Sequence, residues 1–279
     1  MKVKEIMTKD VIYTEVPGSV SEALELIIKH NISGLPVVKK GTKKLVGIVT
    51  KDDFSKNPEE NQLALLMTKD VVTIEPEADI EAAIKIFLEN KFRRLPVIQD
   101  GELVGILTVS DIVWKYIALG NFQKKIEKYM QTNLVAIWEG TPLKVAHEIM
   151  RLSGDRALPV LDDEGKLIGI IADTDLLKEL EMTESTEKSE LSGGTEGDRW
   201  GWDSKNVIYI TKKKLELPNK SVKEVMVRKV ITATKHNTLS DVAKKMARAR
   251  IEQVPVVDAE GNIIGIIKDI DLLHAVLGK

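Results

Sequence analysis

The chain has 279 residues, of which 43% are hydrophobic, so it is long enough to form two domains with substantial cores. Charged residues make up 30% of it but nearly cancel to a net charge of −2, which argues against a broad, basic nucleic-acid-binding surface. The absence of cysteine excludes disulfides, thiolate metal sites and cysteine nucleophiles. Without an apolar run near about 18 residues or a signal-peptide core, we expect a soluble, cytoplasmic protein. The abundance of charge favours a thermophilic source.

The first predicted elements are a short strand and a helix. Residues 11–14 form a β-rich run, which Pro17 ends. Between residues 20 and 28, apolar side chains recur at i, i+3, i+4, i+7 and i+8, which predicts a helix with one buried face. Ser19 is the expected N-cap, with Glu22 as its capping-box partner.

Two apolar runs around Pro36 and Gly47 follow and are predicted to form a hairpin. A second helix should begin near Thr50. The unit therefore has the order β-α-β-β-α.

The same order occurs three more times. A methionine precedes a proline by 29 positions in every unit, and a glycine precedes an aspartate by six. The methionine and proline pairs are Met7 and Pro36, Met67 and Pro96, Met130 and Pro159, and Met226 and Pro255. The main helices of the later units should begin at Asp79, Thr141 and Thr238. Units of about 50 residues are too small to close a good core alone, so we expect them to pair.

An insertion at residues 181–221 interrupts the spacing between the third and fourth units. Residues 181–202 are acidic and rich in serine and glycine, which predicts a mobile loop. Residues 206–210 look like an additional strand. Trp200 and Trp202 either pin the insertion onto the body or form a docking surface for a partner.

The repeated Met-Thr, Leu-Pro-Val and Gly-x-x-Thr-x-x-Asp signatures make the units resemble cystathionine-β-synthase (CBS) domains. Their number resembles the γ regulatory subunit of AMP-activated protein kinase and prokaryotic stand-alone four-CBS proteins. The resemblance implies an α/β (α+β) fold with four CBS repeats paired into two Bateman modules that form a flat disc. The implied repeats are residues 1–57, 58–119, 120–180 and 222–279, and the implied modules are 1–119 and 120–279.

The Thr-x-x-Asp segments are the best candidate sites. One aspartate at a helix start can accept hydrogen bonds from both hydroxyls of a ribose, and the threonine and free amides beside it suit a phosphate. The candidates are Asp53 with Thr50 and Asp111 with Thr108, followed by Asp175 and Asp271, whose units have Ala172 and Lys268 in place of threonine. The same pattern also describes a helix cap that needs no ligand.

Further site residues are implied by the resemblance. Basic residues that would meet phosphates are Arg93, Arg94 and Arg156, and Lys268 could reach a phosphate as well. Backbone groups near Val11, Val71, Leu134 and Val230 would read the adenine edge. The uneven set of cations leaves both an adenine nucleotide (AMP, ADP or ATP) and S-adenosylmethionine open as the ligand, and no metal is expected.

The leading interpretation is a non-catalytic sensor that binds an adenosyl ligand and passes its occupancy to an unidentified regulated protein. An enzyme is disfavoured, because no Walker motif or nucleophile triad is present. A nucleic-acid-binding CBS protein and a structural or dimerisation scaffold without ligand are the alternatives. A homodimer is possible, and no membrane association is expected.

Overall fold

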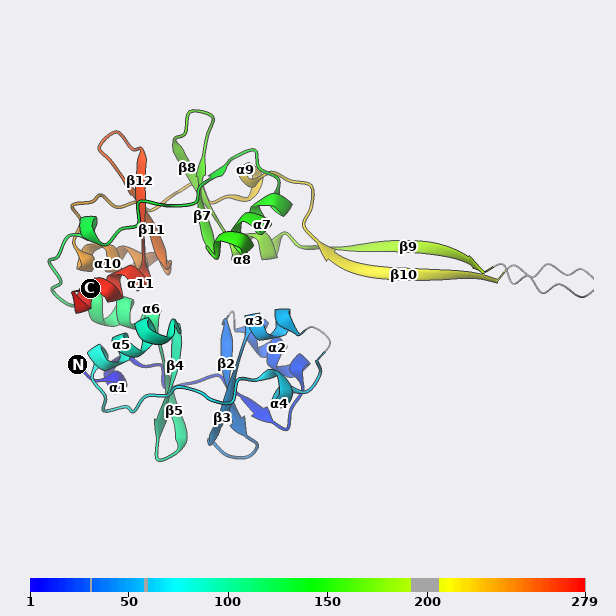
Figure 1. Ribbon diagram of the computed structural model, residues 1–279, viewed down its shortest axis with the longest axis horizontal. Coiled ribbons are helices and arrows are strands. Elements are labelled where there is room, and N and C mark those ends of the chain that lie inside the picture. The colour runs from blue at the N-terminus through cyan, green and yellow to red at the C-terminus, as the bar shows by residue number, and fades with distance from the viewer. Residues whose placement is uncertain (31, 58–59, 192–205, 279) are drawn as a thin grey trace, which may run out of the picture. The chain divides into compact units, whose positions relative to one another are not determined.

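The computed structural model describes residues 1–30, 32–57, 60–191 and 206–278, with the backbone alone for residues 52, 55, 181–191 and 206–215. It contains four repeats that form two compact units (Figure 1). The first unit comprises Met1–Thr132, Thr232–Val256 and Gly265–Lys279, and the second comprises Asn133–Ile231 and Val257–Ile264. In the described part of the chain, no helix is long and apolar enough to cross a membrane. Trp200 and Trp202 lie outside the described residues.

The first repeat has the predicted order of elements after a short helix, α1, that was not predicted. They are α1 (Val3–Ile6), β1 (Thr14–Val16), α2 (Val20–Lys29), β2 (Gly34–Lys39), β3 (Leu45–Thr50) and α3 (Lys51–Lys56). Strand β2 lies between β1, which is parallel to it, and β3, which is antiparallel. The Ser19 hydroxyl accepts a hydrogen bond from the Glu22 amide at 3.2 Å, which confirms the predicted cap. Ala23 and Ile27 on α2 are fully buried against this sheet.

The second repeat has a smaller sheet than predicted. Its elements are α4 (Leu63–Leu66), α5 (Ile80–Asn90), β4 (Arg94–Gln99), β5 (Glu102–Thr108), α6 (Val109–Asp111) and the π-helical η1 (Ile112–Ile117). Strands β4 and β5 are antiparallel. The expected first strand is reduced to a single parallel bridge between Ile74 and Val97.

The third repeat follows the plan of the first, whereas the first strand of the fourth is reduced to a parallel bridge between Ala233 and Val256. The third contains η2 (Ile126–Lys128), β6 (Ile137–Trp138), α7 (Leu143–Ser153), β7 (Ala157–Leu161), β8 (Leu167–Ala172) and α8 (Asp173–Lys178). The fourth contains α9 (Val222–Val225), α10 (Leu239–Ala249), β11 (Gln253–Val257), β12 (Ile263–Lys268) and α11 (Asp269–Leu277). Thr238 caps α10 as predicted, whereas Pro142 rather than Thr141 is the N-cap of α7.

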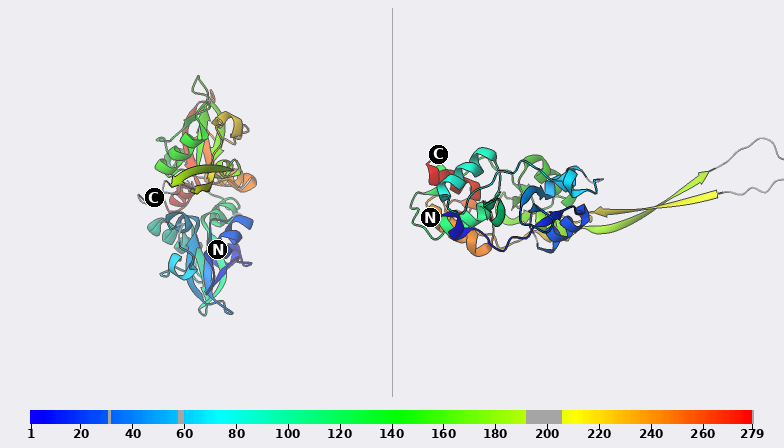
Figure 2. Two further views of the ribbon diagram at one scale, coloured as in Figure 1. Left: turned by 90° about the vertical axis from the view of Figure 1, so that its right-hand side faces the viewer. Right: turned by 90° about the horizontal axis from the view of Figure 1, so that it is seen from below.

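The insertion forms a long hairpin instead of a loop followed by a strand. Strands β9 (Glu181–Leu191) and β10 (Asn206–Glu216) are antiparallel along their whole length (Figure 2). The strand predicted at residues 206–210 is confirmed and is longer, but the loop prediction is wrong for residues 181–191. Their polar composition concealed the strand, because its main-chain hydrogen bonds are made with β10, which begins only at residue 206.

The segment that begins each repeat packs against the third strand of a different repeat. The residue after each methionine forms an antiparallel bridge there: Thr8 with Ile106, Thr68 with Ile48, Gln131 with Ile266, and Val227 with Ile170. A glycine lies under the methionine side chain in three of these contacts, because any Cβ at Gly47, Gly105 or Gly169 would collide with its sulfur. The first two repeats are therefore paired through exchanged segments.

In the first unit, helices of the second and fourth repeats pack against each other. Helix α5 contacts α11, and η1 contacts α10. Ile84 on α5 is completely buried, whereas Leu24, at the equivalent position of the first repeat, is 37% exposed. Equivalent positions in the repeats therefore have different surroundings.

Candidate functional site

Each Thr-x-x-Asp segment, or its equivalent, forms a tight corner between the third strand and the following helix. We call these segments, at residues 50–53, 108–111, 172–175 and 268–271, the corners. At the first corner, Asp53 Oδ2 accepts hydrogen bonds from the amide and the hydroxyl of Thr50, both at 2.8 Å. Asp111 Oδ2 accepts equivalent bonds from Thr108 at 2.9 and 2.6 Å. One carboxylate oxygen at each of these corners therefore acts as a helix cap.

The four corners differ in the partner of the aspartate's second carboxylate oxygen. Asp111 Oδ1 pairs with Lys115 at 2.7 Å, and Asp175 Oδ1 pairs with Lys178 at 3.0 Å. Both oxygens of Asp271 accept hydrogen bonds from the Gln131 amide, at 2.9 and 3.2 Å. Asp53 is half-buried, and its Oδ1 makes no hydrogen bond or ion pair among the described residues.

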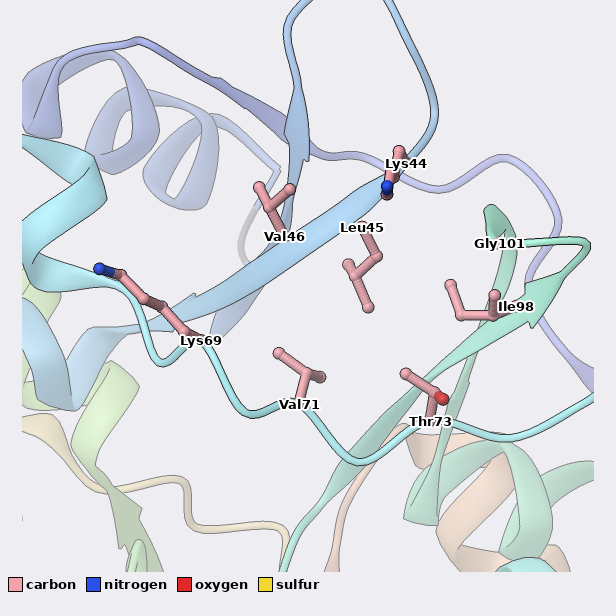
Figure 3. Close-up of a pocket in the computed structure, with 8 residues that line it drawn as sticks. All are labelled: Lys44, Leu45, Val46, Lys69, Val71, Thr73, Ile98 and Gly101. Atoms are coloured by element: carbon pink, nitrogen blue, oxygen red, sulfur yellow. The ribbon is translucent and has the colours of Figure 1, made fainter.

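A hollow of about 300 Å³ lies beside the start of β3 (Figure 3). One wall is the start of β3, and the other is the segment that follows Thr68, together with part of the second hairpin. The lining residues are Lys44, Leu45, Val46, Lys69, Val71, Thr73, Ile98 and Gly101. Strand β3 continues from this hollow for about 13 Å to Thr50, at roughly 3.3 Å per residue. The hollow and the first corner thus share one strand.

Val71 is the predicted adenine-reading residue that lines this hollow. Val11, Leu134 and Val230 do not line it. The amide of Val11 bonds to the Lys9 carbonyl in a turn at 3.0 Å, so the predicted strand begins later, at Thr14. The roles of these four residues stay predictions.

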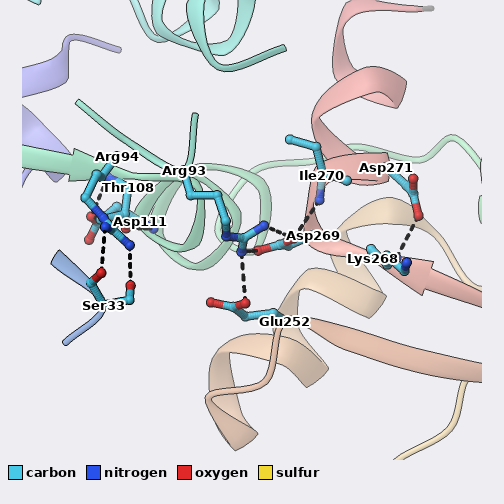
Figure 4. A network of polar contacts seen from close by, with 10 residues as sticks. All are labelled: Ser33, Arg93, Arg94, Thr108, Asp111, Glu252, Lys268, Asp269, Ile270 and Asp271. Carbon is cyan, nitrogen blue, oxygen red and sulfur yellow. Dashed lines mark hydrogen bonds and ion pairs between the residues drawn. The ribbon is translucent and has the colours of Figure 1, made fainter. Parts of the chain in front are cut away.

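Arg94 lies next to the first corner although it belongs to the second repeat. Its guanidinium donates to the carbonyl oxygen of Ser33 at 3.0 Å and to the Ser33 hydroxyl (Figure 4). A Cβ at Gly34 would collide with this guanidinium and would lie 3.1 Å from the Thr50 methyl group. Strand pairing also places Arg94 opposite Thr108. A single cation therefore lies near the threonines of the first and second corners.

Arg93 extends to the fourth repeat. Its guanidinium contacts both carboxylate oxygens of Asp269, at 2.5 and 3.3 Å, and pairs with Glu252 at 3.0 Å (Figure 4). Burial raises the pKa of Asp269, and the Arg93 charge opposes this shift. Burial lowers the pKa of Arg93, but the carboxylates of Asp269 and Glu252 raise it by more, so the net shift is upward. A predicted phosphate-binding residue is thus held in an ion-pair network.

Sequence reasoning did not pair Arg93 with Asp269 and Glu252, although a signal was present. Counted from the proline of each repeat, Glu252 occupies the position that Arg93 occupies in the second repeat. Residues of opposite charge at equivalent positions of two repeats can pair when those repeats meet. The pattern could have indicated which repeats are in contact.

The remaining predicted residues belong to the third and fourth repeats. Arg156 is exposed and directly precedes β7. Lys268 is the N-cap residue of α11, and its amide donates to Asp271 Oδ2 at 2.8 Å. Burial raises the pKa of Asp271, while the hydrogen bonds from Lys268 and Gln131 act in the opposite direction. Among the described residues, no cluster of three acidic or histidine side chains could hold a metal ion.

Comparisons with known proteins agree with the repeats. The CBS domain model matches residues 3–60, 63–117, 126–182 and 222–278. The crystal structure of a conserved protein from Pyrococcus horikoshii superimposes on this chain with a TM-score of 0.71. The sequences are 36% identical, and the match covers 99% of this chain and 100% of the other.

Protein MJ1225 of Methanocaldococcus jannaschii is 28% identical over 295 residues, which cover 98% of each chain. The MJ1225 structure matches with a TM-score of 0.72 and 26% sequence identity, over 99% of this chain and 100% of the other. MJ1225 has been suggested to be an archaeal homologue of γ-AMPK. These relatives come from archaeal thermophiles, in agreement with the interpretation of the composition.

Inosine-5'-monophosphate dehydrogenase of Korarchaeum cryptofilum is 39% identical over 119 residues, which cover 41% of this chain but only 24% of the enzyme. The match to that enzyme therefore concerns a minor part of its length. From the four matched repeats and the full-length relatives, we conclude that this chain belongs to the CBS domain family.

Proposed function

We propose that the protein is a non-catalytic sensor that binds an adenosine-containing ligand between its first two repeats. The observation that carries this proposal is the available oxygen of Asp53, in the first turn of the helix that follows the strand lining the hollow. A carboxylate that is held by one oxygen and available at the other can accept hydrogen bonds from ribose hydroxyls.

The arrangement of groups follows the order of the parts of a nucleotide. Asp53 would bind the ribose through its available oxygen. The adenine ring, which is bonded directly to the ribose, would lie between this corner and the apolar side of the hollow formed by Val46, Val71 and Ile98. Arg94, beside Thr50, would then meet a phosphate.

The charge beside the corner favours an adenine nucleotide over S-adenosylmethionine. The guanidinium of Arg94 attracts a phosphate and repels a sulfonium, and Lys44 and Lys69 at the hollow add further positive charge. We therefore propose AMP, ADP or ATP as the ligand. S-adenosylmethionine remains the alternative, and the other three aspartates remain predicted ribose-binding residues.

Regulation of a partner protein is part of the same proposal. Membership of the CBS domain family and the suggested relationship of MJ1225 to γ-AMPK support it. Thermodynamics requires that the ligand bind one conformation of the protein more tightly than another. The regulated partner, a homodimer and a cytoplasmic location stay predictions.

Isothermal titration of the ligand-stripped protein with AMP, ATP and S-adenosylmethionine tests the proposal. In Asp53→Ala we expect binding of the adenine nucleotide to weaken by about 100-fold or more, because hydrogen bonds to a charged acceptor are each worth roughly 1.5–3 kcal/mol. Asp241→Ala is the matched control, since it removes a capping aspartate at the start of α10, outside the four corners, and should leave this binding unchanged.

An unchanged dissociation constant in folded Asp53→Ala would contradict the proposed site. If the wild-type protein binds none of the three compounds, the corners act only as helix caps. The scaffold interpretation then replaces the sensor.

A further inference from the structure

The residue that follows Met7, Met67, Met130 or Met226 has one fixed place relative to an aspartate in another repeat. Thr68 bridges Ile48, which precedes Asp53 by five positions. Gln131 bridges Ile266, which likewise precedes Asp271 by five positions. Thr8 and Val227 have the same relation to Asp111 and Asp175. Each corner therefore has a neighbour from another repeat, and that neighbour is glutamine only at Asp271.

The backbone holds Gln131 firmly at this place. Its amide donates to the Ile266 carbonyl at 2.8 Å, and its carbonyl accepts from the Ile266 amide at 2.9 Å. A Cβ at Gly265 would lie only 2.7 Å from the Gln131 carbonyl oxygen, so the two backbones are in close contact. The Gln131 side chain consequently starts from a fixed position next to the fourth corner.

The Gln131 amide satisfies Asp271 in the way that a ribose would. Its nitrogen donates to both carboxylate oxygens, at 2.9 and 3.2 Å, and Asp271 is only 8% exposed. Two neighbouring ribose hydroxyls would donate to the same acceptors. At the first corner, the shorter Thr68 side chain makes no such bond to Asp53 among the described residues.

We infer that Gln131 closes the fourth adenosyl site by occupying Asp271 in place of a ribose, and that it thereby determines which repeats bind ligand. This inference rests on the proposed function, since it concerns the same type of site. A ligand at the fourth corner would have to displace two hydrogen bonds to a buried carboxylate. The first corner needs no such displacement.

An exchange of the two equivalent residues tests the inference. In isothermal titrations of the full chain with AMP, Gln131→Thr should gain a binding site that the wild type lacks, and the additional change Asp271→Ala should remove it.

Conversely, Thr68→Gln should weaken binding at Asp53 by about 100-fold, because the introduced amide would compete for the carboxylate. Gln131→Val, which copies the fourth repeat's Val227, serves if the threonine variant does not fold. Thermal unfolding checks the fold of every variant.

The outcomes separate this inference from the proposed function. If wild-type binding depends on Asp53 but the folded Gln131 variants gain no site, the proposed function stands and the inference is overturned. If only the Gln131 variants bind AMP, and this binding depends on Asp271, the inference stands and the proposed site at Asp53 is contradicted. Loss of wild-type binding in Asp271→Ala alone would overturn the inference, and absence of binding in every protein would overturn both.

Discussion

Replacement of Arg93 with methionine is expected to lower the free energy of unfolding by about 3–5 kcal/mol at neutral pH. Asp269 is only 2% exposed, and Arg93 is the cation that contacts both of its oxygens. Removal of that cation leaves a buried carboxylate without its partner charge, while methionine conserves much of the side-chain volume. Chemical denaturation at pH 7 measures the loss.

The double variant Arg93→Met/Asp269→Leu is the control, and we expect it to recover most of the loss because neither charge remains. The single variant should also become less destabilised as the pH falls. Burial already raises the pKa of Asp269, so the folded carboxyl takes up its proton at a higher pH than the unfolded one. A single variant that loses less than about 1 kcal/mol would show that the pair is not effectively buried.

The second large effect is expected for Ile84→Ala, which should cost about 2–5 kcal/mol. Ile84 is fully buried on α5, the helix that packs against α11 of the fourth repeat, so its truncation leaves a cavity. Urea denaturation measures the change.

Leu24→Ala is the matched control because it removes a side chain of similar size at the equivalent position of the first repeat. Leu24 is 37% exposed, so we expect a clearly smaller loss than for Ile84. Equal losses in the two variants would contradict the difference in packing between the two repeats.

The sequence predicted the fold wherever local chemistry decides the structure. The Ser19 and Thr238 caps and the order of elements in each repeat follow from spacing and side-chain type. The strand at residues 181–191 did not, because its pairing partner lies beyond an intervening segment. Similarly, the first strands of the second and fourth repeats shrink to single bridges, since short edge strands depend on their neighbours more than on propensity.

The candidate site was predictable only in part. The Thr-x-x-Asp spacing identified Asp53 and its partner Thr50, but it could not show which aspartates retain an available oxygen. That distinction depends on Lys115, Lys178 and Gln131, which reach the corners by a helical turn or from another repeat. Contacts between repeats are set by tertiary packing, and periodicity within one repeat does not contain them.

The exchanged segments have a consequence for how such a protein can diversify. Because each corner receives the residue after a methionine from a different repeat, an isolated repeat carries two halves of two different proposed sites and no complete one. By the inference drawn above, a substitution at Gln131 would alter ligand binding in the fourth repeat although Gln131 lies in the third. Gene duplication could therefore preserve the proposed function only by copying repeats in pairs. A single substitution of the residue after one of these methionines would then suffice to close one site and leave the others open.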